Sequence, residues 1–496
     1  MSKMTNKNYY GNFSNWDGDY NKIPAFTLST DSEHMVEYTG SAFNIAGVVA
    51  PNRTISLDKI EKETDTKLLP YTDTYKKYTG KNYFIPSSEE GLARKLTNTE
   101  PKRDDNNTNV YKNLYDPIRE EYSKNSLDYI REVISEHGKA YFFPYMMTES
   151  VNTLENIIDS NLKIIAPDLD VVNHLKDKTK MYELMKKRGV PTIEGEVLNN
   201  PKQAKEYFSH KIKDWQNGAF VSAEGGASGV GCLHAKKPND IMNRFQEDHT
   251  DGRLIVQKWI NNIDCAPNVL VYVDNKDAHV LTVSDQIIKN GTDYYGNKYP
   301  SKVDGSLRDK MIKECKKVGE IMGEHGYRGV GGVDGIIVDD DFYFVEINPR
   351  KNHSTVLNSS ILEKVRPDGI PPLSYLEAEL LENGFNKNYN FKKWIKNLNE
   401  SNYTYDMFLY KKKGWHIAKD DPNKYRINDH DWDFKKPYVA NIPKSGVIIS
   451  KTYGSLKSEG HTRRVTPTEL GRIVSRNMHD RLKQIKKMNK AFEEMK

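Results

Sequence analysis

The sequence predicts an α/β protein with a parallel sheet toward its N-terminus and a mixed α+β region after it. Two observations support this prediction. Residues 140–145 (AYFFPY) and 162–166 (LKIIA) are short apolar strands on either side of a helical stretch at 151–158, which is the spacing of a βαβ unit. Farther along, short apolar runs such as residues 219–223 and 267–273 are joined by Gly-rich or polar segments, which is typical of strands in hairpins.

Other elements are expected from helix caps and from the period of the apolar residues. Asp177 begins an amphipathic helix that ends at Arg188, because Gly189 favours a C-cap and Pro191 blocks extension. The segment after Pro349 is rich in loops and contains further helices. The remaining expected elements are helices at 126–137 and 310–325, and strands at 230–235, 254–259, 332–338, 342–347 and 446–449.

Composition excludes several classes of protein. The chain has 496 residues, of which 37% are hydrophobic and 29% charged, so it can bury sizeable cores and is not disordered as a whole. No run approaches the roughly 18 apolar residues of a membrane span, and residues 1–13 lack the apolar core of a secretory signal. Cys232, Cys265 and Cys315 are too widely spaced for a disulfide scaffold or a CxxC metal site. We therefore expect a cytoplasmic protein that does not bind membranes.

The net charge of +5 equals the charge of the last 25 residues, so the rest of the chain sums to zero. Residues 472–496 are expected to form a solvated basic helix with Ile473, Leu482, Ile485 and Met488 as its apolar stripe. A chain that is neutral outside one tail is not a dedicated nucleic-acid binder, so no specific nucleic acid is expected as a partner. Salt-sensitive nucleic-acid binding through the tail is the alternative.

The segment Gly331–Arg350 (GGVDGIIVDDDFYFVEINPR) is the most informative part of the sequence. Residues 339–341 are expected to form the turn of a β-hairpin. A turn centred on residue 340 places Asp334 opposite Glu346, and Asn348 shares the face of Glu346. Two opposed carboxylates repel each other unless one is protonated or a cation bridges them. Oxygen ligands from Asp, Glu and Asn suit Mg²⁺.

The same turn centre pairs Ile336 with Phe344 and Val338 with Phe342, and Arg350 adds a fixed positive charge beside the carboxylates. Two alternatives stay open for this segment. It is either the proposed metal site or a solvent-facing hairpin with incidental acids. A three-residue loop with a bulge would also shift the register by one residue and separate the two carboxylates.

A second motif lies at residues 219–235 (AFVSAEGGASGVGCLHA), where Gly225, Gly226 and Gly229 separate two apolar runs. It is not a P-loop, because no Lys-Ser/Thr follows the glycines. Backbone N–H groups of such a hairpin can close over phosphates, and a flexible surface hairpin is the alternative. Residues 254–260 (LIVQKWI) are either an edge strand or a hinge whose backbone binds an adenine ring.

Together these segments resemble the ATP-grasp superfamily over about residues 137–360, in the family's order. The segments similar to family motifs are Asp177-Lys178 with Gly189-Val190-Pro191 (the DK…GxP element), 219–235 (the glycine-rich loop), 257–260 (the adenine hinge), and 332–334 with 345–350 (the metal-binding strands). Residues 140–168 resemble the strand edge of the N-terminal domain that precedes this fold.

The resemblance implies an ATP-dependent ligase that activates a substrate carboxylate as an acyl phosphate and joins it to an amine or a thiol, releasing ADP and phosphate. It implies ATP and one or two Mg²⁺ ions, with Mn²⁺ as an alternative metal. The implied ATP-binding residues are Lys178, Ser222, Gly225, Gly226, Gly229, Gln257, Lys258 and Ile260. The implied metal ligands are Asp334, Glu346 and Asn348. Arg350 is the implied catalytic residue and stabilises negative charge that develops during the reaction.

Two departures from the family pattern matter. Ser222 stands where the family usually has a phosphate-binding lysine, and Gln257 replaces the hinge acid. The lost ammonium weakens phosphate binding unless Lys236, Lys237 or Lys289 substitutes. A catalytically silent nucleotide-binding protein is therefore the first alternative function, although an intact set of metal ligands argues for turnover. A biotin-carboxylase-type enzyme is the second alternative.

The resemblance implies a small-molecule carboxylate and an amine as substrates, such as an amino acid or a small peptide in specialised metabolism. Residues 290–301 (NGTDYYGNKYPS) lie where the superfamily often binds substrate, and a surface loop is an equal alternative. The candidate substrate residues are Gln286, Asn297 and His353. Whether the acceptor is free or bound to a carrier protein stays open, and a homodimer is compatible with the sequence.

Four regions are expected along the chain. Residues 1–22 form a mobile arm, and 23–135 form an N-terminal domain that precedes the ATP-grasp domain. The ATP-grasp domain covers 136–360, with a lid subdomain at about 178–256. Residues 361–496 form a C-terminal extension that ends in the basic helix.

Overall fold

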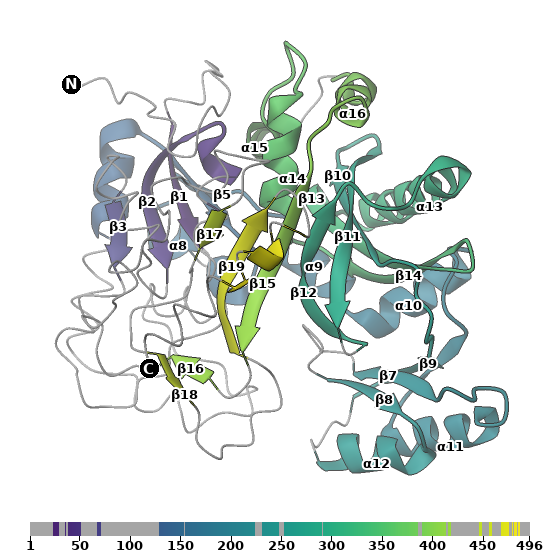
Figure 1. Cartoon of the computed structure of the whole chain (residues 1–496). Coiled ribbons are helices and arrows are strands. Elements are labelled where there is room, and N and C mark those ends of the chain that lie inside the picture. The colour runs from purple at the N-terminus through teal and green to yellow at the C-terminus, as the bar shows by residue number, and fades with distance from the viewer. Residues whose placement is uncertain are drawn as a thin grey trace. The chain divides into compact units, whose positions relative to one another are not determined.

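The computed structural model describes two compact units (Figure 1). Unit 1 combines residues 1–169 with residues 353–496, and unit 2 is residues 170–352. The described residues are 23–28, 35, 38–50, 67–70, 128–152, 154–223, 231–247, 252–289, 291–384, 389–412, 415–417, 446–448, 456–458, 468–475, 479, 481–483, 485 and 486. The expected arm at 1–22 and the glycine-rich turn at 224–230 lie outside these residues. The predicted domain boundaries at 135 and 360 stay predictions.

Unit 1 contains a parallel sheet with the strand order β3-β2-β1-β4-β5. Its buried strand β4 (Ala140–Pro144, AYFFP) pairs in parallel with β1 and with β5, so the predicted βαβ unit is confirmed. A strand that is apolar at every position suits a parallel sheet, which is covered on both faces. The other elements here are β1 (Pro24–Leu28), β2 (Asn44–Ala50), β3 (Lys67–Pro70), a helix over 128–137, α7 (Glu149–Asn152), α8 (Leu154–Ile157) and β5 (Leu162–Ile164).

The C-terminal part of unit 1 contains buried helices and an antiparallel sheet with the order β15-β19-β17. Its elements are α14 (Thr355–Lys364), α15 (Leu373–Asn383), α16 (Phe391–Asn399), β15 (Tyr405–Lys412), β16 (Trp415–Ile417), β17 (Gly446–Ile448), β18 (Leu456–Ser458) and β19 (Thr468–Ser475). The strand expected at 446–449 is confirmed as β17.

The predicted start of the terminal basic helix at residue 472 is wrong. Arg472 and Ile473 lie in strand β19, where Ile473 pairs with Phe408 on one side and with Val447 on the other. The backbone pairing of β19 with two strands therefore replaces the predicted helix at these residues. Leu482, which was expected in the apolar stripe, is 46% exposed.

Unit 2 is built around an antiparallel sheet with the order β14-β13-β10-β11-β12. Its elements are β10 (Pro267–Val273), β11 (Ala278–Lys289), β12 (Asp293–Tyr299), α13 (Gly305–Glu324), β13 (Gly329–Val338) and β14 (Asp341–Asn348). The helix α13 begins five residues before the expected start at 310. Residues 293–299, for which a surface loop was one alternative, form the strand β12 with the buried residue Tyr295.

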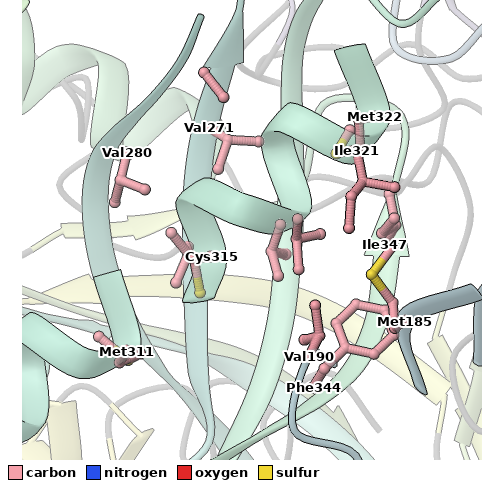
Figure 2. Close-up of a cluster of buried hydrophobic side chains, with 14 of the residues drawn as sticks. Met185, Val190, Val271, Val280, Met311, Cys315, Ile321, Met322, Phe344 and Ile347 are labelled. Atoms are coloured by element: carbon pink, nitrogen blue, oxygen red, sulfur yellow. The ribbon is translucent and has the colours of Figure 1, made fainter. Parts of the chain in front are cut away.

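The core of unit 2 lies between α13 and one face of this sheet (Figure 2). Val269, Val283 and Val333 belong to it, together with Cys315 and Met322 of α13. Because neighbouring residues of a strand point to opposite faces, the alternate positions of β10, β11, β13 and β14 lie on the other face. Those alternate positions carry the polar side chains described below.

Two helices precede this sheet in the chain, α9 (Leu169–Leu175) and α10 (Lys178–Lys187). The predicted helix start is confirmed, because the Asp177 side chain caps α10 and accepts hydrogen bonds from the backbone N–H groups of Thr179 and Lys180 at 3.1 Å each. The helix packs against β14 and buries Met181 and Met185.

A second, smaller sheet in unit 2 has the order β6-β9-β7-β8 and is covered by α11 and α12. Its elements are β6 (Gly195–Leu198), α11 (Pro201–Lys211), β7 (Ala219–Ala223), β8 (Cys232–Ala235), α12 (Pro238–Glu247) and β9 (Leu254–Lys258). Phe208, Trp215 and Phe245 fill the space between the sheet and its helices. Among the described helices, none is both long and apolar enough to cross a bilayer.

Candidate active site

The β13–β14 hairpin brings Asp334 and Glu346 directly opposite each other, as predicted. The turn and the register that produce this pairing differ from those predicted. The turn has two residues, Asp339 and Asp340, with φ of 51° and 61°, and Asp341 already belongs to β14. Aspartate is one of the few residues other than glycine that adopts this left-handed conformation readily.

The two-residue turn shifts the register by one, so the predicted pairs Ile336–Phe344 and Val338–Phe342 are wrong. A bulge between Asp334 and Gly335 then adds one residue on β14 and restores the pair of carboxylates. Gly335 suits this position, because a Cβ atom there would lie 2.2 Å from the ring of Phe342.

Asp334 is a buried carboxylate held by carboxamide groups from two neighbouring strands. The Nδ2 atom of Asn268 on β10 donates to Oδ1 of Asp334 at 2.5 Å, and Nδ2 of Asn348 donates to Oδ2 at 2.8 Å. Burial and the charge of Glu346 raise the pKa of Asp334 to about 7, although hydrogen bonds from Asn268 and Gln286 and the charge of Arg350 oppose this shift. A bound cation would relieve this cost.

Glu346 forms an ion pair with Lys178, whose Nζ atom lies 2.6 Å from Glu346 Oε2. Burial lowers the pKa of Lys178, but the charge of Glu346 and the hydrogen bond to it outweigh burial, so the net pKa is raised. Asp334 and Cys232 contribute in the same direction. Lys178 therefore carries its charge at the junction of α10, the hairpin and strand β8.

Arg350 follows the hairpin and is held by three acceptors. Its Nη2 atom donates to Asn348 Oδ1 at 2.9 Å, and its Nη1 atom donates to the Lys351 carbonyl at 3.0 Å and to Asn352 Oδ1 at 3.4 Å. The Asn352 side chain packs closely against Gly332 of β13. A Cβ atom built on Gly332 would lie 1.9 Å from Asn352 Nδ2. The absence of a side chain at residue 332 thus makes room for a group that orients Arg350.

The residues implied in phosphate binding are only partly within the described chain. Ser222 is buried on β7 and pairs with Cys232 on β8. It lies two residues before the glycine-rich segment at 224–230 in the sequence. Gly225, Gly226 and Gly229 lie outside the described residues. Lys178 is close enough to Cys232 to lower the pKa of its thiol, against the larger effect of burial.

The lysines considered as substitutes for the missing strand lysine lie elsewhere. Lys236 and Lys237 follow the far end of β8, where their backbone N–H groups donate to the Asp240 side chain at 2.9 and 2.8 Å. The Nζ atom of Lys289 lies 4.5 Å from the ring centre of Tyr295. Lys178, in contrast, forms its ion pair with Glu346 on β14.

The hinge residues form the end of strand β9. Gln257 is buried and Lys258 is the last residue of the strand. The backbone N–H of Lys258 donates to the Glu194 carbonyl at 2.9 Å, and that of Trp259 donates to the Gly218 carbonyl at 3.0 Å. Ile260 follows directly after the strand.

Trp259 packs between two segments that the sequence did not connect. Its ring stacks on His234 of β8 with centroids 3.6 Å apart and planes 7° apart. On another side it meets Gly291, where a Cβ atom would lie 2.7 Å from the indole. The hinge is therefore packed against both the small sheet and the β11–β12 turn.

The three substrate candidates have different surroundings. The Gln286 side chain hydrogen-bonds Asp334, which brings it to the metal-binding strands. Asn297 is 1% exposed and donates to Ser284 Oγ at 3.1 Å, so it has a structural role on β12. His353 belongs to unit 1, where its ring packs against Tyr145 with centroids 6.3 Å apart.

Sequence reasoning missed Asn268 and Asn352. Asn268 pairs with both Ser284 and Asp334, so a row of polar side chains crosses β11, β10 and β13 on the face away from α13. The available signal was an asparagine in the otherwise apolar strand PNVLVYV. Two carboxylates and a carboxamide oxygen are ligand types that suit Mg²⁺, and a bound cation would offset the burial and the charge of Glu346 that raise the pKa of Asp334.

The comparisons with known proteins identify the class of this region. Residues 175–354 match the family model described as the ATP-grasp domain. The chain therefore contains an ATP-grasp domain, and the predicted resemblance and α/β fold class are confirmed.

Particular relatives are ligases and carboxylases. The butirosin acyl-carrier protein–L-glutamate ligase of Niallia circulans is 23% identical over 209 residues, which are 41% of this chain and 50% of the ligase. Biotin carboxylase of Haemophilus influenzae is 24% identical over 225 residues, which are 41% of this chain and 46% of that enzyme. The chain thus spans about half the length of these relatives. Their names agree with the prediction of an ATP-dependent ligase.

A solved structure extends the similarity of fold beyond the matched domain. The biotin carboxylase domain dimer of the Hydrogenobacter thermophilus 2-oxoglutarate carboxylase, in complex with MgADP, ADP and bicarbonate, has a TM-score of 0.55 and 13% sequence identity. The similarity covers 92% of this chain and 86% of that chain. At this identity the similarity concerns the fold alone.

Proposed function

We propose that this chain is an ATP-dependent carboxylate–amine or carboxylate–thiol ligase that forms ADP. The observation that carries the proposal is the opposed pair Asp334 and Glu346, with Asn348 and Lys178 in direct contact with it and Arg350 hydrogen-bonded to Asn348. Asp334 is buried and Glu346 partly buried, so the pair destabilises the fold unless cations compensate it, and a binding module without catalysis has little reason to keep it.

The reaction consists of two substitutions. A carboxylate oxygen of the first substrate attacks the γ-phosphorus of ATP, the bond to the β-phosphate oxygen breaks, and ADP leaves. The amine or thiol of the second substrate then attacks the acyl carbon, loses its proton, and displaces inorganic phosphate. Both steps move negative charge, so catalysis depends on positively charged groups at fixed positions.

Several residues of this chain would supply or hold these positive charges. Asp334, Glu346 and Asn348 would hold one or two Mg²⁺ ions, or Mn²⁺, which neutralise phosphate charge when bound. Lys178 would bind phosphate oxygens in place of the lysine that Ser222 replaces. Arg350 would stabilise the phosphoryl group during transfer. The small sheet with Gly225, Gly226 and Gly229 in its turn would cover the triphosphate, and the backbone of residues 257–260 would bind adenine.

An amino acid or small peptide is the substrate class that we propose. Gln286 contacts the metal-binding strands and offers neutral hydrogen-bonding groups to such a substrate. The ligase of Niallia circulans is named for an acyl-carrier protein and L-glutamate, so a carrier-bound acceptor belongs among those tested. A homodimer stays a prediction.

The proposal is tested by a screen for ATP turnover with Mg²⁺ and hydroxylamine across the proteinogenic amino acids, with and without a carrier protein. We expect ADP and a hydroxamate for one carboxylate, both lost in Glu346→Gln. AMP with pyrophosphate would contradict the acyl-phosphate route. ADP release that depends on bicarbonate would favour the carboxylase alternative. Tight nucleotide binding without turnover of any substrate would favour the catalytically silent alternative.

A further inference from the structure

Two cationic side chains contact two of the three proposed metal ligands. Lys178 Nζ lies 2.6 Å from Glu346 Oε2, and Arg350 Nη2 lies 2.9 Å from Asn348 Oδ1. The third ligand, Asp334, accepts hydrogen bonds from neutral carboxamides instead. Each cation therefore takes an acceptor oxygen that a metal ion would use, and each would lie beside a divalent ion bound there.

We propose that Lys178 and Arg350 are exchangeable counter-ions of this site. A divalent cation that binds Glu346 and Asn348 displaces the charged ends of Lys178 and Arg350, and these ends then bind the phosphates of the nucleotide. This inference rests on the proposed function only for the metal and nucleotide sites, and it holds whichever carboxylate and amine are the substrates.

Charge is the physical reason for the exchange. Lys178 already neutralises Glu346, and Arg350 lies beside Asn348, so the site has little negative charge left for a divalent ion as it stands. A divalent ion within a few ångströms of Lys178 and Arg350 raises the local charge by two, and repulsion between these groups is strong in a partly buried site. The phosphates of a nucleotide supply the negative charge that lets all three cations stay.

The two side chains are tethered so that their charged ends can move a short distance. Lys178 is the first residue of α10, directly after the cap Asp177, so its backbone is fixed while its long side chain is flexible. Arg350 keeps its Nη1 contacts with the Lys351 carbonyl and with Asn352 when Nη2 leaves Asn348. Lys178 also interacts electrostatically with Cys232 on strand β8.

The exchange predicts that metal and nucleotide bind cooperatively. Metal alone competes with two internal cations, and nucleotide alone competes with Glu346 for Lys178. When both are present, each removes the competitor of the other. By linkage, the factor by which metal tightens nucleotide binding equals the factor by which nucleotide tightens metal binding.

The experiment measures Mn²⁺ affinity from the electron paramagnetic resonance signal of the free ion, with and without ATP, in the full-length protein. Lys178→Met removes one competing cation, so we expect Mn²⁺ alone to bind about tenfold more tightly, the order expected for a unit charge near a partly buried ion. The same variant lacks a phosphate ligand, so ATP in the presence of Mg²⁺ should bind about tenfold more weakly. One substitution thus shifts the two affinities in opposite directions.

Lys180→Met is the matched control. Lys180 Nζ lies 2.8 Å from Asp177 Oδ2, and its loss changes the net charge equally two residues away, so we expect both affinities to stay within about twofold of wild type. If Lys178→Met unfolds the chain, Arg350→Gln tests the second counter-ion with the same opposite shifts.

The outcomes separate this inference from the proposed function. If Mn²⁺ binding is lost in Glu346→Gln but unchanged or weakened in folded Lys178→Met, the metal site stands and the exchange is wrong. If Glu346→Gln leaves Mn²⁺ binding intact, the proposed metal site is wrong, and the exchange fails with it. Tighter Mn²⁺ binding in both Lys178→Met and Lys180→Met would show a general charge effect and would also overturn the exchange.

Discussion

Replacing Gly332 with alanine would test how Arg350 is positioned. The new Cβ atom would lie 1.9 Å from Nδ2, 2.8 Å from Cγ and 3.1 Å from Oδ1 of Asn352. An ordinary contact needs about 3.4 Å, so Asn352 must move by about 1.5 Å and would lose its contact with Arg350 Nη1. A displacement of about 1 Å in a catalytic group can cost on the order of 10²-fold in rate.

We expect Gly332→Ala to lower kcat for ADP release by about 100-fold, with the carboxylate that the hydroxamate screen identifies. The affinity for ATP should change by less than about threefold, because Arg350 keeps its charge and its contacts with Asn348 and the Lys351 carbonyl, and loses only the contact with Asn352. Overpacking should also lower the free energy of unfolding by about 1–3 kcal/mol, which denaturant titration measures.

Gly331→Ala is the control, because the adjacent position faces the other side of the strand. A Cβ atom there would meet the Met322 side chain and the Tyr327 hydroxyl at 3.1 Å and the Asn348 backbone carbonyl at 3.3 Å, and Asn352 is not among its nearest contacts. This variant should lose comparable stability and keep a rate near wild type. Equal rate losses in the two variants, or a wild-type rate in folded Gly332→Ala, would refute the role of Asn352.

The double variant Gly332→Ala/Asn352→Ala separates the clash from the lost contact. Shortening Asn352 removes the atoms that the new Cβ meets, so we expect stability to return toward wild type. The rate should stay low, because Arg350 still lacks its partner. Recovery of both properties together would mean that Gly332→Ala acts only by distorting the strand.

Three further predictions follow from the polar face and the helices of unit 2. Because the pKa of Asp334 is raised to about 7 and a metal binds the charged form, Mn²⁺ affinity should rise with pH through about 7, and Asp334→Asn should abolish this slope. Asn268→Leu removes a hydrogen bond to Asp334 and should weaken Mn²⁺ binding by about 10- to 100-fold. Thr282→Val is the control, because it is a buried change on the next strand and should leave Mn²⁺ binding unchanged. Equal losses in the two variants would contradict a role for Asn268. Burial and the charges of His325 and Lys180 lower the pKa of His174, so the folded state favours its neutral form. The free energy of unfolding should therefore fall as pH drops below about 6.5. Thermal unfolding should show a smaller fall in His174→Gln.

Local patterns in the sequence were enough to predict the elements that carry the site. Asp177 caps α10 as expected, and β4 and β5 pair in parallel as expected. The pairing of Asp334 with Glu346 was also right, but for an incomplete reason. A shorter turn and a bulge at Gly335 each shift the register by one residue, and the two shifts cancel. No local pattern distinguishes this arrangement from a regular hairpin.

Contacts between residues far apart in the chain could not be predicted in this way. Asn268 reaches Asp334 across 66 residues of sequence, and Gly291 touches Trp259 from the turn of a hairpin that was not expected to be a hairpin. The terminal strand β19 shows the same limit, because it pairs with β15, which lies about 60 residues earlier in the chain, and local pattern alone did not predict that pairing.

Unit 1 is assembled from both ends of the chain, and this has a consequence for the order of events during synthesis. Tyr38 donates to Glu377 at 3.1 Å, and Ser41 shares a hydrogen bond with Ser374 at 2.8 Å. These bonds join residues that are more than 300 positions apart in the sequence. Unit 1 therefore cannot complete its fold until its second half has been synthesised. Unit 2 is continuous in sequence and can fold as soon as it is made. We therefore expect nascent chains stalled after residue 352 to present a folded ATP-grasp core beside an N-terminal sheet that still lacks its partner helices.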